Sequence, residues 1–307
     1  MALFMGLVWL VVAIAVAMGL GLLFRQGVIA VAPKGVAKEL RTAPMTASFG
    51  MMMIVIYVVV AVLAPVIAPF GETEIVGREY SAWNDENILG TDNLGRDMLS
   101  RMIYAARNTV GIAFVTTALA FIVGSILGLL AAIVGGWLDQ LLSRTVDVLM
   151  AIPSLIFALL LLTIVGTSII NMIVIIALID STRVFRLARA VAMNIVVMDY
   201  VEAARLRGEG LWRLITREIL PNAMAPLVAE FGLRFCFVFL MISALSFLGL
   251  GMPPSTADWG SMVKDNATLI TFGDITPLLP AGAIALLTVS VNFVVDWQLH
   301  RASGLKE

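Results

Sequence analysis

Seven apolar stretches, most of them about 20 residues or longer, dominate this chain of 307 residues. A hydrocarbon core about 30 Å thick needs roughly 20 apolar residues per crossing helix. Backbone groups cannot stay unpaired in lipid, so these stretches are expected to be α-helices, and they lack the alternation of barrel strands. We therefore predict an all-α integral membrane protein with spans at approximately 4–24, 49–70, 108–135, 143–166, 168–187, 226–250 and 278–299.

The composition agrees with lipid as the main solvent, because 61% of the residues are hydrophobic and only 13% are charged, against about a quarter charged in soluble domains. The net charge of −1 gives no reason to expect a nucleic-acid partner. The single cysteine, Cys236, and the single histidine, His300, leave little scope for a disulfide, a metal site or a catalytic pair. No metal site and no catalytic residue are predicted.

The distribution of charge predicts the orientation of the spans. Arginine and lysine outnumber acids in 25–47 and 188–225, which places both segments and the C-terminal tail in the cytoplasm under the positive-inside rule. Segments 71–107 and 251–277 then lie outside, together with the N-terminus. The first stretch has no lysine or arginine before it, as a signal peptide would, so we favour an uncleaved span.

The cytoplasmic segment 188–225 is longer than a simple connector requires. Its pattern predicts a helix over 199–207, a break at glycines 208 and 210, and a second helix over 211–220 that Pro221 stops or kinks. A short exposed helix of this kind suits a partner's groove. It suits the membrane surface equally well, so the pattern alone leaves both readings open.

A motif in this segment resembles the EAA loop of binding-protein-dependent ABC importer permeases. Glu202-Ala203-Ala204 is followed by Gly208 and then by Ile219-Leu220-Pro221, although the isoleucine sits one position closer to the proline than in the family pattern. Residues 89–101, 245–251 and 258–260 resemble the external segments of the C-type dipeptide, oligopeptide and nickel permeases. The resemblance covers about residues 48–300, and residues 1–24 form an extra span beyond the usual six.

The resemblance implies a type I ABC importer transmembrane domain of six core helices plus one extra N-terminal helix. Residues 1–47 would hold the extra helix and a cytoplasmic linker, 48–107 the first core helix and an external segment, and 108–307 the core permease domain. Its coupling loop, at about 195–222, would dock on an ATPase. The coupling residues that it implies are Glu202, Ala203, Ala204, Arg205, Gly208, Leu220 and Pro221.

The same resemblance implies a set of partners. They are a homologous second permease, two cytoplasmic ATPase subunits and a periplasmic or extracellular substrate-binding protein, assembled in a bacterial or archaeal cytoplasmic (inner) membrane. None of the four lysines follows a glycine, so the chain has no P-loop. It is therefore not expected to be an enzyme, and ATP and Mg would be held by the partner ATPases. The implied cargo is a short peptide or a similar small polar solute.

Polar residues inside the spans are costly and face a partner or a cavity. Glu230 and Arg234 are four residues apart and are expected to pair along one helix face, and Asp180 has Arg183 and Arg186 within reach. Pairing or placement at the interface is favoured over substrate contact for this set. The pathway candidates are Asn292, Asp296, Glu230 and Arg234.

In the outer segment 71–107, Thr91, Asp92 or Asn93 is expected to cap a helix running from about 94 to 107. Two rival functions remain. A membrane-embedded enzyme is disfavoured because no nucleophile–base pair is evident. An ion-coupled secondary transporter is the alternative, although such proteins concentrate their polar groups in the middle of the membrane, whereas this chain concentrates them in a cytoplasmic loop.

Overall fold

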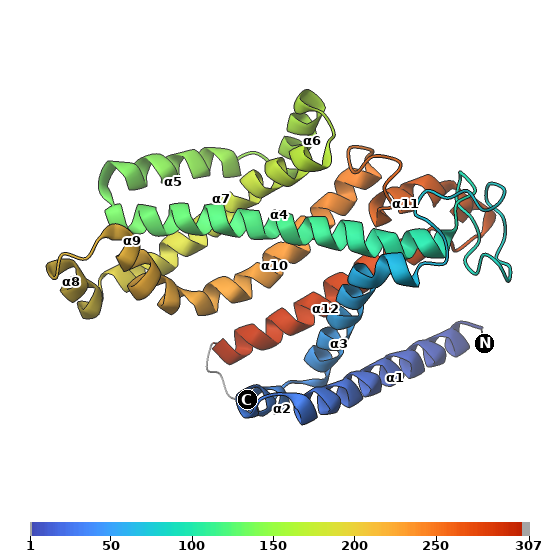
Figure 1. Ribbon diagram of the computed structural model, residues 1–307, viewed down its shortest axis with the longest axis horizontal. Helices are drawn as coiled ribbons and strands as arrows, with labels where there is room; N and C mark the ends of the chain where they lie inside the picture. The colour runs from blue at the N-terminus through green and yellow to red at the C-terminus, as the bar shows by residue number, and fades with distance from the viewer. Residues whose placement is uncertain (1, 303–307) are drawn as a thin grey trace.

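The computed structural model of the chain describes residues 2–302, apart from the side chains of 2–14, 36 and 302. Within these residues the fold is all-helical, with two isolated antiparallel bridges near residues 75–97. Figure 1 shows an elongated bundle. Its elements are α1 (Ala2–Val31), α2 (Lys34–Arg41), α3 (Met45–Ile67), α4 (Met98–Val134), α5 (Gly136–Met150), α6 (Ser154–Val165), α7 (Ile169–Val196), α8 (Asp199–Leu206), α9 (Leu211–Arg213), the π-helical η1 (Leu214–Ile219), α10 (Leu220–Phe247), α11 (Trp259–Asn266), the 3₁₀-helical η2 (Ala267–Phe272) and α12 (Leu278–Ala302).

Several of these helices are long and apolar enough to cross a membrane. In the described part of the chain four qualify by length and composition: α3, α4, α10 together with the turns before it, and α12. The bent pair α5 and α6 makes a fifth if it is counted as one span. Helix α7 was predicted to span and has 28 residues, but Asp180 and three arginines lower its hydropathy. The all-α membrane fold is confirmed.

The predicted span at 143–166 is wrong as a single helix. The chain bends by 89° between α5 and α6. Pro153 stands immediately before α6, where its ring and missing N–H prevent the helix from continuing. The break therefore has a local cause that was visible in the sequence.

Two further predictions about the outer segment are wrong. No separate helix covers 94–107, because α4 begins at Met98 and continues for 37 residues. The cap is not Thr91, Asp92 or Asn93 but Asp97, whose carboxylate accepts hydrogen bonds from the Ser100 N–H and hydroxyl, both at 2.7 Å. The Asp92 carboxylate instead forms ion pairs with two arginines, which are described below.

An Asp97→Ala variant is expected to lose about 1 kcal/mol of stability, because the first turn of α4 loses its cap. Asp97→Asn, which keeps an acceptor oxygen, should lose less. Unfolding can be followed by the reaction of a maleimide dye with the buried Cys236 thiol. If the unfolding midpoint of Asp97→Ala equals that of the native chain, this cap does not stabilise the helix.

The main core surrounds Trp259 at the start of α11. Its ring packs edge-on against Tyr57 of α3 and Phe239 of α10, with centroids 5.7 and 6.2 Å apart. Its indole N–H donates to the Met102 carbonyl of α4 at 3.2 Å. The side chain is almost fully buried, so one aromatic residue ties together three helices that lie far apart in the sequence.

Helices α4 and α7 approach most closely at two glycines of α4. A Cβ added at Gly124 would lie 2.5 Å from the Ser181 carbonyl oxygen, and one added at Gly128 would lie 2.6 Å from the Phe185 carbonyl oxygen. Small residues four apart let helix backbones touch inside a membrane. This pair was not predicted, although its Gly-x-x-x-Gly spacing is visible in the sequence.

Segment 188–225 and the predicted external segments lie at opposite ends of the bundle. Helices α8 and α9 lie at the left of Figure 1, and α11 and the 68–97 loops lie at the right, whereas α2, which was also predicted to be cytoplasmic, lies at the bottom of the view. The extra helix α1 packs along α3, where Gly21 approaches the Phe49 backbone. An ion pair between Arg301 and Glu39 joins the end of α12 to α2.

Candidate functional site

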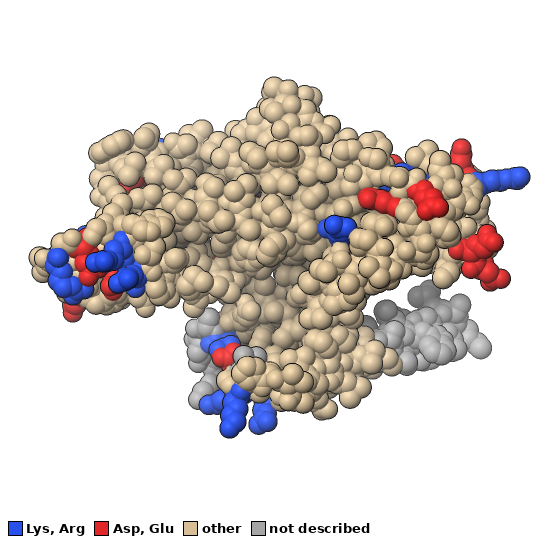
Figure 2. All heavy atoms as spheres, in the orientation of Figure 1, with Lys and Arg blue, Asp and Glu red and all other residues tan. Residues whose placement is uncertain are grey.

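The predicted coupling segment forms the left end of the bundle in Figure 1, where α8 extends beyond the end of α4. Figure 2 shows basic side chains gathered there among a few acidic ones, and the basic residues of this segment are all arginines. Large apolar side chains are also exposed at this end, among them Val197, Trp212 and Leu206, which is 83% exposed. Apolar and charged side chains thus share one exposed surface.

Helix α8 has one face toward the bundle and one toward solvent. Glu202, Ala203 and Arg205 are exposed, and no ion pair joins Glu202 to another described residue. Ala204 is fully buried, so of the two adjacent alanines only Ala203 is exposed to a partner. It packs in a second core whose other members include Val201, Leu214, Ile215, Ile219 and Ala223.

A glycine turn sets the direction of the chain after α8. Gly208 has φ of +78° and donates its N–H to the Arg205 carbonyl at 2.9 Å, while the Glu209 N–H reaches the Ala204 carbonyl at 3.2 Å. This is the Schellman pattern, in which a left-handed residue, most often glycine, ends a helix. Arg205 also donates to the Ile133 carbonyl at 3.2 Å, which ties α8 to the end of α4.

Pro221 was predicted to stop or kink the helix after this turn, and the helix does not stop there. It widens into η1, where the Leu220 N–H donates to the Ile215 carbonyl, five residues back, and it continues directly into α10. Proline lacks an N–H and crowds the preceding turn, and a π-helical turn is a known form of local adjustment in such helices. Leu220 is half-buried and Pro221 is exposed.

Four charged side chains meet near the middle of α7 and α10, and we call them the α7–α10 ion cluster: Asp180, Arg183, Glu230 and Arg234. Arg234 Nε lies 2.7 Å from Glu230 Oε1, so the predicted pair forms. Asp180 Oδ1 lies 3.6 Å from Arg234 and 3.7 Å from Arg183. The contact between Asp180 and Arg234 joins the two helices.

The other two pathway candidates lie on α12, outside this cluster. Asn292 is half-buried and Asp296 is exposed, and among the described residues none forms an ion pair with Asp296. Arg186, a possible partner of Asp180, instead approaches Asp147 of α5 at 3.9 Å. The structure therefore brings together Glu230 and Arg234 with Asp180, and leaves the α12 pair apart.

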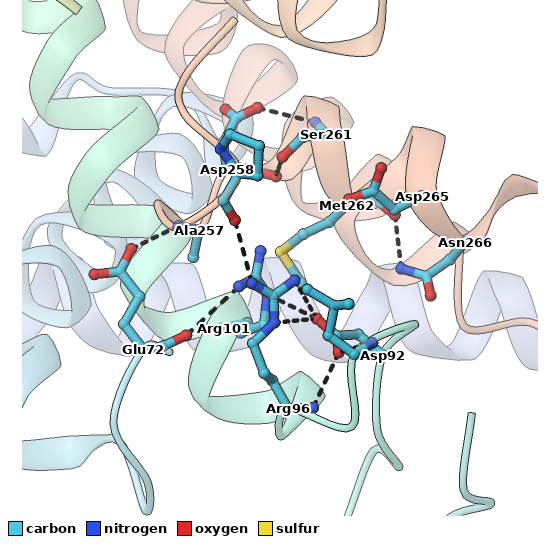
Figure 3. Close-up of polar contacts among 12 residues, drawn as sticks. Glu72, Asp92, Arg96, Arg101, Ala257, Asp258, Ser261, Met262, Asp265 and Asn266 are labelled. Carbon is cyan, nitrogen blue, oxygen red and sulfur yellow. Dashed lines mark hydrogen bonds and ion pairs between the residues drawn. The ribbon is translucent and has the colours of Figure 1, made fainter. Parts of the chain in front are cut away.

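A second group of buried polar residues joins the loop before α4, the first turns of α4 and α11 (Figure 3). Its centre is Asp92, which binds Arg96 at 2.7 Å and Arg101 at 3.2 Å. All three side chains are buried. Arg96 also donates to the Pro254 carbonyl at 3.2 Å. One carboxylate thus holds the loop before α4, the first turns of α4 and the loop before α11.

Two more carboxylates extend this group, which we call the outer polar cluster (Glu72, Asp92, Arg96, Arg101, Asn108, Thr109 and Asp258). Glu72 accepts hydrogen bonds from Asn108, at 2.8 Å, and from the Ala257 N–H. Asp258 accepts from the Thr109 hydroxyl and from the Ser261 N–H, both at 2.9 Å, and so caps α11. Burial raises the pKa of the Asp258 carboxyl, and these hydrogen bonds act in the opposite direction.

Comparison with known proteins finds one family and several similar chains. Residues 124–302 match the family described as binding-protein-dependent transport system inner membrane component. The chain is 33% identical to the dipeptide transport system permease protein DppC of Haemophilus influenzae, over 81% of this chain and 87% of the relative. It is 35% identical to the di/tripeptide transport system permease protein DppC of Pseudomonas aeruginosa, over 80% and 84%. A chain from the crystal structure of an amino acid ABC transporter with histidines aligns with a TM-score of 0.48 and 18% identity, over 66% of this chain and 94% of that chain.

Proposed function

Because the chain belongs to the binding-protein-dependent transport system inner membrane components, the permease subunits of ABC importers, we propose that it forms half of a translocation pathway for short peptides. Its relatives are named for dipeptides and for di- and tripeptides. The pathway would open alternately to the two sides of the membrane, driven by ATP and Mg bound to separate ATPase subunits. Alternating access is a two-state change whose balance a ligand shifts.

The observation that carries the coupling role is the two-sided helix α8. Its buried face, with Val201 and Ala204, packs on the bundle, and its exposed face offers Glu202, Ala203 and Arg205. A force on the exposed face would therefore reach α4 and α10 through packed side chains. The helix stands at the tip of the bundle (Figure 1), and exposed apolar residues lie beside it, as expected of a surface that contacts another protein or a membrane.

The proposed complex contains a homologous second permease and two cytoplasmic ATPases. One chain offers one α8, whereas a closing ATPase dimer has two grooves, so a second permease is required. A substrate-binding protein would deliver peptides to the external end, where the outer polar cluster holds the loops before α4 and α11. The complex is proposed to reside in the cytoplasmic (inner) membrane of a bacterium or archaeon, with Asn292, Asp296, Glu230 and Arg234 as pathway residues.

The test is purification of the tagged chain in mild detergent with its partners, followed by an ATPase assay of the reconstituted importer. We expect Glu202→Ala and Gly208→Val to lose most of the ATPase stimulation by binding protein and peptide. A β-branched residue at φ of +78° costs about 1–2 kcal/mol, which would displace α8. Gly210→Val is the matched control, because Gly210 has an ordinary φ of −69° and open space around it.

Two outcomes would contradict this proposal. Equal stimulation in Gly208→Val and Gly210→Val would remove the coupling role of this turn. Recovery of the chain without any ATPase, together with peptide uptake that depends on an ion gradient and ignores ATP, would favour the ion-coupled secondary transporter instead.

A further inference from the structure

The α7–α10 ion cluster lies near the middle of two long helices yet is open at one edge. The side chain of Arg183 is 40% exposed and that of Glu230 is 22% exposed, whereas Arg234 and Asp180 lie deeper, at 12% and 5%. A partly exposed arginine or glutamate at this depth is costly in hydrocarbon and faces water or protein instead. This face of the bundle is therefore turned away from lipid.

The cluster has hydrogen-bonding capacity that the protein does not use. Asp180 Oδ2 is buried and accepts no hydrogen bond from the described residues. Arg234 Nε is close to Glu230, but its N–H is not aligned with the carboxylate, so it also lacks a hydrogen bond. Buried polar groups are nearly always satisfied in native proteins. Arg234 Nε still has an ionic partner in Glu230, whereas Asp180 Oδ2 has none, and a ligand with a donor such as an ammonium group would satisfy it.

We propose, building on the proposed import of peptides, that the α7–α10 ion cluster binds the charged termini of a zwitterionic peptide inside the membrane. Asp180 and Glu230 would receive the ammonium group, and Arg183 and Arg234 the carboxylate. The cluster holds two anions and two cations, so it is neutral without a ligand and stays neutral with a zwitterion bound. Every charge in the membrane is therefore compensated both before and after the peptide binds.

The residues around the α7–α10 ion cluster differ from those that line the large apolar groove of the bundle. That groove, about 600 Å³, lies between α3, α4, α10 and α12, and the described residues that line it include no charged one. It has no partner for an ammonium or carboxylate group. At the ion cluster, by contrast, the exposed ring of Phe237 lies 4.7 Å from the Arg234 guanidinium and offers an apolar surface beside the charges.

The test measures binding of radiolabelled dialanine to the assembled permeases and ATPases in nanodiscs, without the binding protein, which would impose its own selectivity. We expect native complex to bind dialanine, and N-acetylated or C-amidated dialanine to compete at least about tenfold less well, as expected when a hydrogen bond to a charged group is lost. The double variant Glu230→Gln/Arg234→Gln should lose dialanine binding by a similar factor. Replacing both partners avoids leaving one charge buried alone.

The matched control is Asp139→Asn/Arg189→Gln, which neutralises another ion pair between α7 and a neighbouring helix. It should bind dialanine as the native complex does. Equal binding by both double variants, or no binding by a native complex that imports dialanine when its binding protein is present, would overturn the inference and leave the proposed function standing. Absence of import by the complete native importer would instead contradict the proposed function.

A second measurement covers the case in which the double variant fails to assemble. Arg183→Cys should react with a membrane-impermeant thiol reagent in the intact complex. The native chain supplies the background, because its single cysteine is buried. No reaction at position 183 in any state of the transport cycle would show that this face is closed to water, and would refute the site.

Discussion

A Gly128→Leu variant is expected to yield no assembled permease. The Cβ of any residue at 128 would lie 2.6 Å from the Phe185 carbonyl oxygen and 2.9 Å from the Ala188 Cβ. Such distances are well inside van der Waals contact, and the atoms belong to a neighbouring helix backbone that cannot move aside. Overpacking of this kind costs about 1–3 kcal/mol where the surroundings can adjust, and more where helices must separate.

The matched control for this prediction lies in the same helix. A Cβ at Gly111 meets no atom within 4 Å, so Gly111→Leu should be tolerated and even favoured by up to about 1 kcal/mol through helix propensity. The measurement is the yield of monodisperse protein after size-exclusion chromatography in mild detergent. Similar yields for the two variants would show that close approach of α4 and α7 is not required.

The Asp92→Asn variant is expected to lose about 3–5 kcal/mol of stability, the usual effect of removing one partner from a buried ion pair. Two buried guanidinium groups, of Arg96 and Arg101, would lose their shared counter-ion and repel each other. We expect the loops before α4 and α11 to detach together, because both are joined through this carboxylate. The loss of stability is measured as a lower midpoint of thermal unfolding. Detachment of the loops is measured as faster protease cleavage between residues 73 and 88.

The control is Asp85→Asn, which changes an exposed carboxylate of the same external segment. Exposed substitutions usually change stability by less than about 0.5 kcal/mol. If Asp92→Asn behaved like Asp85→Asn, the ion pairs of Asp92 would contribute little to stability, and the external loops would be held by the other contacts of the outer polar cluster and by the packing around Trp259.

The coupling segment illustrates how far a motif predicts a site. Local sequence accounts for the helix over 199–206 and for the turn at Gly208. A run of good helix formers that ends at a glycine needs no contact with distant residues. Local sequence does not account for the burial of Ala204, because it depends on the packing of α8 against η1 and α7. Two adjacent alanines look alike in the sequence and face opposite environments in the bundle.

The polar residues inside the bundle show the same division. The spacing of Glu230 and Arg234 predicted their pair, since residues four apart are neighbours on any helix. That Asp180 joins them, and that Asp92 rather than Asp97 binds two arginines, depended on which helices cross and at what depth. Similarly, α4 was predicted as two elements, because its first turns, up to Arg107, carry charged residues and the rest of the helix is apolar.

The sequence by itself determined that this chain is an all-α membrane protein, because apolar length and the cost of unpaired backbone in lipid allow little else. It also determined the family, through the spacing of a motif that local structure preserves. Only the tertiary structure decided which charged groups share a site, which alanine is buried, and where glycines bring α4 onto α7. Those facts depend on contacts between helices far apart in the chain, and such contacts leave no periodic pattern in either helix.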